Sequence, residues 1–98
     1  MVDMNYELMV IIKPLLPEDI KSKVLKKIEK LVKQAGGKIN ETDVWGKRHL
    51  AYKIKSHEEG YYVVLDLNLD TDKVKEFEHD LKLESDVLRY LLIKRDNI

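Results

Sequence analysis

The order of the apolar patterns along this chain is the feature that most restricts its fold. Some segments alternate apolar and polar residues, the period of a β-strand, and others repeat apolar residues every three or four positions, the period of a helix. The strand patterns cover 6–12, 38–44 continuing or resuming over 45–55, 61–69 and 87–94, and the helix patterns cover 17–35 and 70–82. Two strand-helix-strand crossovers joined by a hairpin predict an α+β, ferredoxin-like βαββαβ fold, a four-stranded antiparallel sheet with two helices on one face.

Cap and turn residues agree with this order. Pro17 suits the first position of a helix, and the pair at 36–37, Gly-Gly, is a common helix end. Asp70 or Thr71 is expected to cap the second helix. The polar segment 56–60, which ends in glycine, predicts a hairpin loop of about five residues.

In such a fold the helices cover one face of the sheet and leave the other open. The helix-facing residues are expected to be Leu8, Val10, Ile12, Leu65, Leu67, Leu88, Tyr90 and Leu92. The open-face residues are expected to be Met9, Ile11, Val64, Leu91 and Ile93, with Arg89, Tyr62 and Asp66 among them. Several large aliphatic side chains on an open face indicate a surface for a protein partner. The alternative is scattered apolar residues on a solvated sheet.

The composition narrows the class of protein. The 98 residues, 44% of them hydrophobic, allow one domain over 1–98 with a modest core. Eighteen basic and eighteen acidic residues give a net charge of zero, which argues against strong unaided binding to polyanions but leaves room for a basic patch. The absence of cysteine excludes disulfides and thiolate metal sites and is typical of cytoplasmic proteins. The start shows no signal-peptide pattern, and no apolar run reaches the roughly 20 residues of a membrane span.

Signals for catalysis are poor. There is no glycine-rich phosphate loop, and His49, His57 and His79 lie in separate elements without the spacing of metal ligands. The segment 13–17 lacks the arginine-bearing anion loop that an acylphosphatase of this fold would need. We therefore expect no enzymatic activity, no cofactor, no metal and no small-molecule substrate.

Binding of RNA by base stacking on the sheet is a further possibility for this topology. Of the expected stacking positions only Tyr62 is aromatic, whereas Met9, Ile11 and Val64 are aliphatic. Trp45 is suited either to stacking on a base or to anchoring the strand by local packing. The sheet therefore fits a protein partner better than unstacked bases.

The segment 45–55 combines features that a surface hairpin rarely needs together. Gly46 predicts a bulge or a kink, and the two following cations, Lys47 and Arg48, would then project side by side. Leu50, Tyr52 and Ile54 alternate with polar or small residues and should share one face of a strand. By contrast, the lysines of the segment 21–33 read as the solvated face of the first helix.

This segment resembles a known family signature, in which glycine and a basic residue precede Leu-Ala-Tyr, one variable residue and Ile. Those residues stand at 46–54 here, and the chain is similar to the same family at 6–7 (Tyr-Glu), 60–62 (Gly-Tyr-Tyr) and 87–89 (Val-Leu-Arg). The family is that of bacterial small-subunit ribosomal protein six. The resemblance covers most of the chain.

The resemblance implies a structural constituent of the small ribosomal subunit in the cytoplasm. Members of this family bind the central domain of the small-subunit ribosomal RNA as a heterodimer with the small, basic ribosomal protein eighteen, which would supply charge that a neutral chain lacks. We expect RNA contacts from Lys47, Arg48, Arg89, Lys94 and Arg95. We expect the partner protein on Met9, Ile11, Val64, Leu91 and Ile93 and along the edge of the second strand. The alternative is a protein-only dimerising or adaptor domain of the same fold, which self-associates through the open sheet without RNA.

Overall fold

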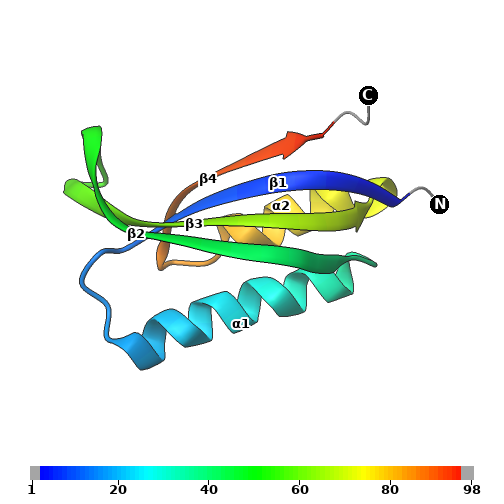
Figure 1. The fold of residues 1–98 in the computed structure, drawn as a ribbon, viewed down its shortest axis with the longest axis horizontal. Helices are drawn as coiled ribbons and strands as arrows, with labels where there is room; N and C mark the ends of the chain where they lie inside the picture. The colour runs from blue at the N-terminus through cyan, green and yellow to red at the C-terminus, as the bar shows by residue number, and fades with distance from the viewer. Residues whose placement is uncertain (1–2, 96–98) are drawn as a thin grey trace.

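The computed structural model describes residues 3–95, and its elements follow the predicted order (Figure 1). The elements are β1 (Asp3–Ile12), α1 (Glu18–Gln34), β2 (Lys38–Ile54), β3 (His57–Asp70), the 3-10 turn η1 (Thr71–Lys73), α2 (Val74–Lys82) and β4 (Val87–Lys94). The four strands form one antiparallel sheet in the order β2-β3-β1-β4, which confirms the ferredoxin-like fold. The expected lack of a signal peptide rests partly on residues 1–2, which lie outside the described residues.

The main core lies between the sheet and the two helices. The central strands β1 and β3 send alternate side chains into it, as their period-two pattern predicts. Its buried residues include Tyr6, Leu8, Val10 and Ile12 of β1, Val63, Leu65, Leu67 and Leu69 of β3, Val24, Ile28, Leu31 and Val32 of α1, and Phe77 and Leu81 of α2. Burial of each such large side chain contributes about 1.5–3 kcal/mol, so this layer holds the helices on one face of the sheet.

Tyr90 faces the helices as predicted, and its hydroxyl donates a hydrogen bond to Glu78 Oε1 on α2 at 3.1 Å. Burial, and then the contact with Glu78, raise the pKa of the Tyr90 hydroxyl. The bond ties the edge strand β4 to the second helix. None of the helices in residues 3–95 is long and apolar enough to cross a bilayer.

Leu88 corrects one of the predicted faces. The expected helix-facing position is wrong, because the pairing of β1 with β4 shifts between Ile11, opposite Arg89, and Ile12, opposite Val87. The extra residue turns Leu88 to the open face, where it is buried with Ile11 and Leu50. Val87 enters the main core in its place. One inserted residue reverses the side-chain alternation, and periodicity alone does not reveal it.

The hairpin between β2 and β3 also differs from the prediction. The turn is two residues long, Lys55 and Ser56, both with positive φ (48° and 71°), and β3 begins at His57. This backbone resembles the tight turns that suit twisted hairpins, but it lacks their usual Asn or Gly. Gly60 lies within β3 opposite Arg48, where an added Cβ would meet the side chain of Ile11. The glycine thus permits close packing rather than a loop.

The predicted helix ends are confirmed with small shifts. α1 begins at Glu18, one residue after Pro17. Gly36 has φ +69°, and the amide of Gly37 donates to the carbonyl of Val32 at 3.0 Å, an arrangement that satisfies the last carbonyls of the helix. Asp70 Oδ1 accepts from the amide of Asp72 at 3.0 Å and so caps the turn that leads into α2.

Candidate functional site

A bulge in β2 sets the direction of the segment predicted to carry the chemistry. Pairing with β3 shifts between Val44, opposite Val63, and Gly46, opposite Tyr62. Gly46 has φ +82°, and an added Cβ there would meet nothing within 4 Å. Glycine is therefore favoured at this position by its left-handed backbone conformation and not by a shortage of space. The predicted bulge is confirmed, and Trp45 is the extra residue in it.

Trp45 is held by its neighbours and acts as a packing anchor. Its ring stacks on Tyr62 with 6.4 Å between centroids and 11° between planes, and its Nε1 donates to Asp43 Oδ2 at 3.0 Å. The Arg48 guanidinium lies 5.8 Å from the Trp45 ring centroid, and Arg48 Nε donates to the Trp45 carbonyl at 3.4 Å. Of the two predicted roles, the geometry favours the anchor over a free platform for a base.

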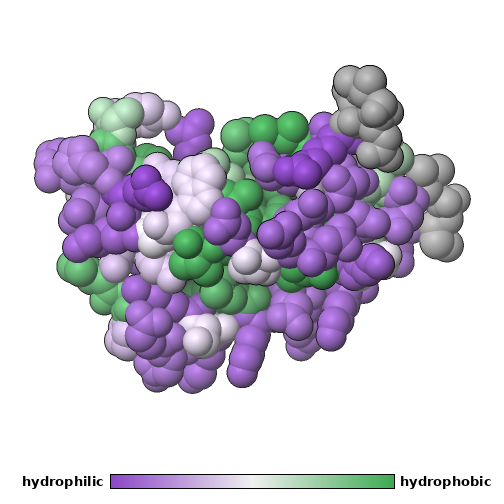
Figure 2. Space-filling view, viewed as in Figure 1, coloured by the Kyte–Doolittle hydropathy of each residue, from purple (hydrophilic) through white to green (hydrophobic). Residues whose placement is uncertain are grey.

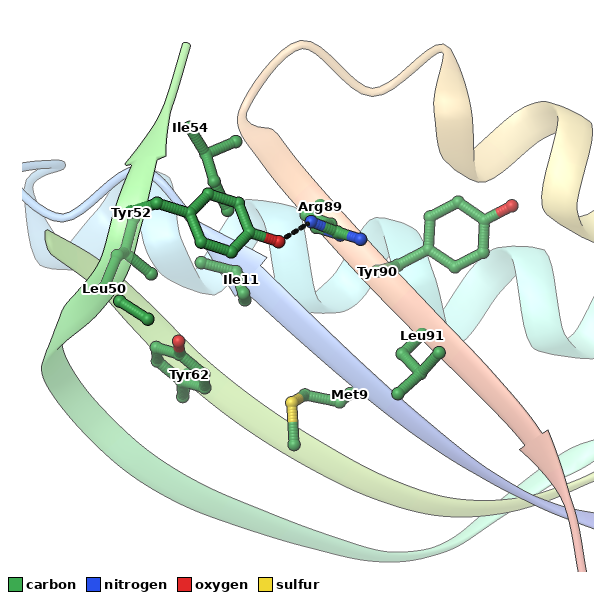
Figure 3. Close-up of a pocket in the computed structure, with 10 residues that line it drawn as sticks. Met9, Ile11, Leu50, Tyr52, Ile54, Tyr62, Arg89, Tyr90 and Leu91 are labelled. Atoms are coloured by element: carbon green, nitrogen blue, oxygen red, sulfur yellow. Dashed lines mark hydrogen bonds between the residues drawn. The ribbon is translucent and has the colours of Figure 1, made fainter. Parts of the chain in front are cut away.

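Beyond the bulge, β2 curls over the open face of the sheet. Its pairing with β3 lapses after His49 and resumes only where Ile54 meets His57. Leu50, Tyr52 and Ile54 all line one groove, as their alternation predicts (Figure 3). Leu50 is buried, whereas Tyr52 is 63% exposed and stands at the rim.

This groove, which we call the sheet groove, has a volume of about 250 Å³. It is lined by Met9, Ile11, Leu50, Ala51, Tyr52, Ile54, Tyr62, Arg89, Tyr90 and Leu91. Arg89 Nη1 donates to the Tyr52 hydroxyl at 2.6 Å, a bond that joins the two edge strands across the groove (Figure 3). The hollow is thus mainly apolar with one cation, a chemistry that suits a protein side chain.

The predicted partner residues lie on this face. Met9, Ile11 and Leu91 line the sheet groove, and Val64 is half-buried beside Met9 in the β1–β3 register. Leu91 and Ile93 are 54% and 46% exposed, unusually high for large aliphatic residues on a strand. Ile11 is mostly buried with Leu50, so it forms the floor rather than the accessible surface.

The predicted RNA-binding residues fall in three separate places rather than in one patch. Lys47 and Arg48 lie exposed on β2 just beyond the bulge, with Lys47 Nζ 3.9 Å from Glu59 Oε2. Arg89 lies in the sheet groove. Lys94 and Arg95 are exposed at the end of β4. The sequence pattern did not reveal this separation, because it depends on which strands form the edges.

Arg95 belongs to a polar network at the other end of the open face. Its Nη2 donates to Glu7 Oε1 at 2.8 Å and its Nη1 to Asp66 Oδ2 at 3.4 Å. Asp66 Oδ1 also accepts from the side-chain amides of Asn5 at 2.5 Å and Asn40 at 3.3 Å. The hydrogen bond from Asn5, with help from Asn40 and Arg95, lowers the pKa of the Asp66 carboxyl.

We call this group the polar network; its members are Asn5, Glu7, Asn40, Asp66, Asn68 and Arg95. The hydrogen bond to Glu7 raises the pKa of Arg95, whose exposed guanidinium is already paired with carboxylates of the protein itself. Sequence reasoning missed the network. The only feature of the sequence that pointed to it is that Asp66 and Asn68 follow apolar residues on the same face of β3. Within residues 3–95 no three His, Asp or Glu side chains gather closely enough to hold a metal ion.

The fold and the surface are those of a ferredoxin-like domain whose helix-free face carries an apolar groove, with exposed cations on the edge strands. The family model "Ribosomal protein S6" matches residues 5–94. The chain is 43% identical to the small ribosomal subunit protein bS6 of Saccharopolyspora erythraea, over 93% of this chain and 77% of that protein. It is 38% identical to the bS6 protein of Caldanaerobacter subterraneus subsp. tengcongensis, over 95% and 98%.

A solved structure agrees with these sequence matches. The crystal structure of 30S ribosomal protein S6 from Thermotoga maritima superposes with a TM-score of 0.88 at 28% identity, covering 96% of this chain and 89% of that one. The chain belongs to the ribosomal protein S6 family. The family that the sequence signature pointed to is confirmed, and it is a family of ribosomal proteins rather than of enzymes.

Proposed function

We propose that this protein, folded as one domain over 1–98, binds the central domain of the small-subunit ribosomal RNA together with small-subunit ribosomal protein eighteen, in the cytoplasm. Its role is assembly of the small subunit. The observation that carries the proposal is the apolar sheet groove on the open face together with the exposed pair Lys47 and Arg48 on the neighbouring edge strand β2. The apolar sheet groove suits a protein partner, and the adjacent cations Lys47 and Arg48 suit RNA.

The partner protein covers the aliphatic part of the face. Leu91 and Ile93 provide the exposed apolar surface, with Met9 and Val64 beside them and Ile11 beneath. Covering apolar surface gains roughly 25 cal/mol per Å² removed from water, less the entropy lost on association. A partner that is itself basic also explains how a chain of zero net charge takes part in RNA binding.

The RNA meets the cations around this face. Lys47 and Arg48 are exposed on the edge strand β2, and the guanidinium of Arg89 keeps donors beyond the one that Tyr52 accepts. A guanidinium can bind phosphate through two parallel hydrogen bonds, which favours Arg48 and Arg89 as the main contacts. Lys94 is peripheral, and Arg95 must exchange its bonds to Glu7 and Asp66 to reach phosphate.

Filter binding to a junction RNA in the presence of the partner protein tests these roles. Arg48→Ala and Arg89→Ala should each weaken binding and lower the slope of log affinity against log salt by about one. Lys75→Ala, an exposed lysine on α2, is the control and should change neither quantity. If both arginine variants bind like the parent protein, the RNA assignment is wrong.

A gradient profile tests the assembly role itself. The untagged protein should sediment with small ribosomal subunits. A stable homodimer by light scattering, with no protein in the subunit fractions, would instead favour a protein-only dimerising domain.

A further inference from the structure

The outer face of α1 carries a row of cations that the proposed function does not use. Its members are Lys23, Lys26, Lys30 and Lys33, and we call them the lysine stripe. The three- and four-residue spacing places them on one side of the helix, opposite the buried Val24, Ile28 and Leu31. All four are exposed, and Figure 2 shows long hydrophilic side chains projecting along the edge where α1 lies.

The stripe lacks counter-charges within the described part of the chain. The other two lysines of α1 form ion pairs, Lys21 with Glu18 at 3.5 Å and Lys27 with Glu84 at 3.1 Å. Between residues 3 and 95 no carboxylate lies within 4.0 Å of a stripe lysine. Removal of the stripe's charge should therefore cost the fold little.

The charge of the chain is segregated rather than evenly mixed. α1 holds six lysines against three carboxylates, whereas α2 holds two lysines against three carboxylates. The two helices cover the same face of the sheet, so the positive excess belongs to one side of that layer. A neutral protein thereby has a local positive field, which is what attracts a polyanion.

The positive surface continues from the helix to the start of β2. Lys33 and Lys38 flank a hollow of about 330 Å³ between α1 and β2, which Glu29 also lines. Lysine is a point charge without the two-pronged geometry of arginine, so such a surface suits sugar-phosphate backbone and not base edges. A membrane surface fits less well, because the apolar side of α1 is buried in the core and has nothing to insert.

We propose that the lysine stripe is a second RNA-binding surface, which holds the phosphate backbone of an RNA segment on the helix side while the open sheet face holds the partner protein and the junction RNA. The stripe lies on the outer side of α1 and the sheet groove lies on the helix-free face of the sheet, so both can be occupied at once. This goes beyond the proposed function, which requires only the sheet side.

Tethered cleavage in reconstituted small subunits tests the proposal. The chain has no cysteine, so Lys26→Cys, Lys47→Cys and Lys75→Cys each offer one site for an iron chelate that cuts nearby RNA backbone. The probe at position 26 should cut an rRNA segment different from the one cut from position 47. The probe at position 75, on α2, should cut at least several-fold less.

The outcomes separate this inference from the proposed function. Cutting from position 47 together with only background cutting from position 26 would overturn the inference and leave the proposed function standing. No RNA cutting from either position would overturn both. Damage to a neighbouring protein chain instead of RNA from position 26 would assign the stripe to an acidic protein and also overturn the inference.

Matched charge removal provides the second measurement. The triple variant Lys26→Gln, Lys30→Gln and Lys33→Gln should lower the salt slope of binding to the complete small-subunit rRNA, with the partner present, by about two to three. The triple variant Lys73→Gln, Lys75→Gln and Lys82→Gln removes the same charge from the η1–α2 region and should lower it by less than about one. Equal slopes for the two variants would contradict a specific role for the stripe.

Discussion

The two ends of the open sheet face have opposite chemistry, although the same strands build both. At one end, the side chains of the polar network bond to one another: Asp66 accepts hydrogen bonds from Asn5 and Asn40 and forms an ion pair with Arg95. At the other end, Tyr52 and Leu91 are 63% and 54% exposed around the sheet groove. The polar side chains of the first end find their hydrogen-bond partners within the protein, whereas the second end leaves apolar side chains exposed to water. Under the proposed function, the partner protein binds at the second end.

Local backbone features create this difference. The bulge at Trp45 and Gly46 and the lapse of pairing after His49 lift the end of β2 away from β3 and over the sheet. A regular hairpin would place Leu50 beside β3 and leave no hollow beneath it. At the polar end β2 also has a register shift, at Asn40, but β1 and β3 stay regularly paired there and the network side chains meet across neighbouring strands.

Leu91→Asp should give the largest effect. A charge at the groove rim would lose its water when the partner covers it, so affinity for the partner should fall about 100-fold, near 3 kcal/mol. Leu83→Asp is the matched control, because Leu83 is 70% exposed at the end of α2 and lies outside the groove. Titration by calorimetry or filter binding measures both. Undiminished affinity of the Leu91 variant would remove the groove from the partner interface.

Leu50→Ala tests whether the groove end has a core of its own. Leu50 is buried with Ile11 and Leu88 beneath the groove, so the truncation should lower the free energy of unfolding by about 2–3 kcal/mol. Leu91→Ala, at the exposed rim, should lower it by less than about 0.5 kcal/mol. Urea unfolding compares the two. Similar small losses would mean that the curled part of β2 is not fixed by packing.

The sequence predicted the fold well because strong periodic patterns dominate it. Side-chain period alone predicts three features that the structure confirms. They are the buried side of α1, the bounds of β4 and the shared face of Leu50, Tyr52 and Ile54. The errors occur where one residue breaks the period. Leu88 falls on a register shift, and the turn at Lys55–Ser56 uses positive φ at residues that do not signal it.

The site was only partly predictable for a related reason. The aliphatic open face follows from alternation, and Gly46 gave a correct signal for the bulge. The Arg89–Tyr52 bond joins residues 37 positions apart on opposite edge strands, so it depends on the tertiary path of β2. The ion pair of Arg95 with Glu7 likewise depends on the β1–β4 register, which no local pattern encodes.

Asp66→Asn tests the polar end. Loss of the carboxylate weakens its bonds to Arg95 and Asn5, so the free energy of unfolding should fall by about 1–2 kcal/mol at pH 7. Because the folded-state pKa of Asp66 is lowered, its contribution is present above the unfolded pKa near 4 and is lost as the pH falls through the folded value. The difference from the parent protein should therefore shrink below about pH 4.

Urea unfolding at several pH values between neutral and acidic measures this difference. Asp80→Asn, on α2, gives the cost of losing a carboxylate outside the network. Partner affinity of the Asp66 variant should match that of the parent protein, since the network lies away from the groove. A large loss of partner affinity would contradict the division of the face into two ends.

Tyr52→Phe should give the smallest change in stability and separates the shape of the groove from its composition. It deletes only the oxygen that accepts from Arg89 at 2.6 Å. Because Tyr52 is 63% exposed, water can replace that bond, and unfolding should become easier by no more than about 0.5 kcal/mol. If the bond holds the curled end of β2 over the groove, partner affinity should still fall several-fold.

Tyr62→Phe is the control, because it removes a hydroxyl inside the groove without touching the bond to Arg89. Equal affinities for the two variants would mean that packing of Leu50 alone shapes the groove.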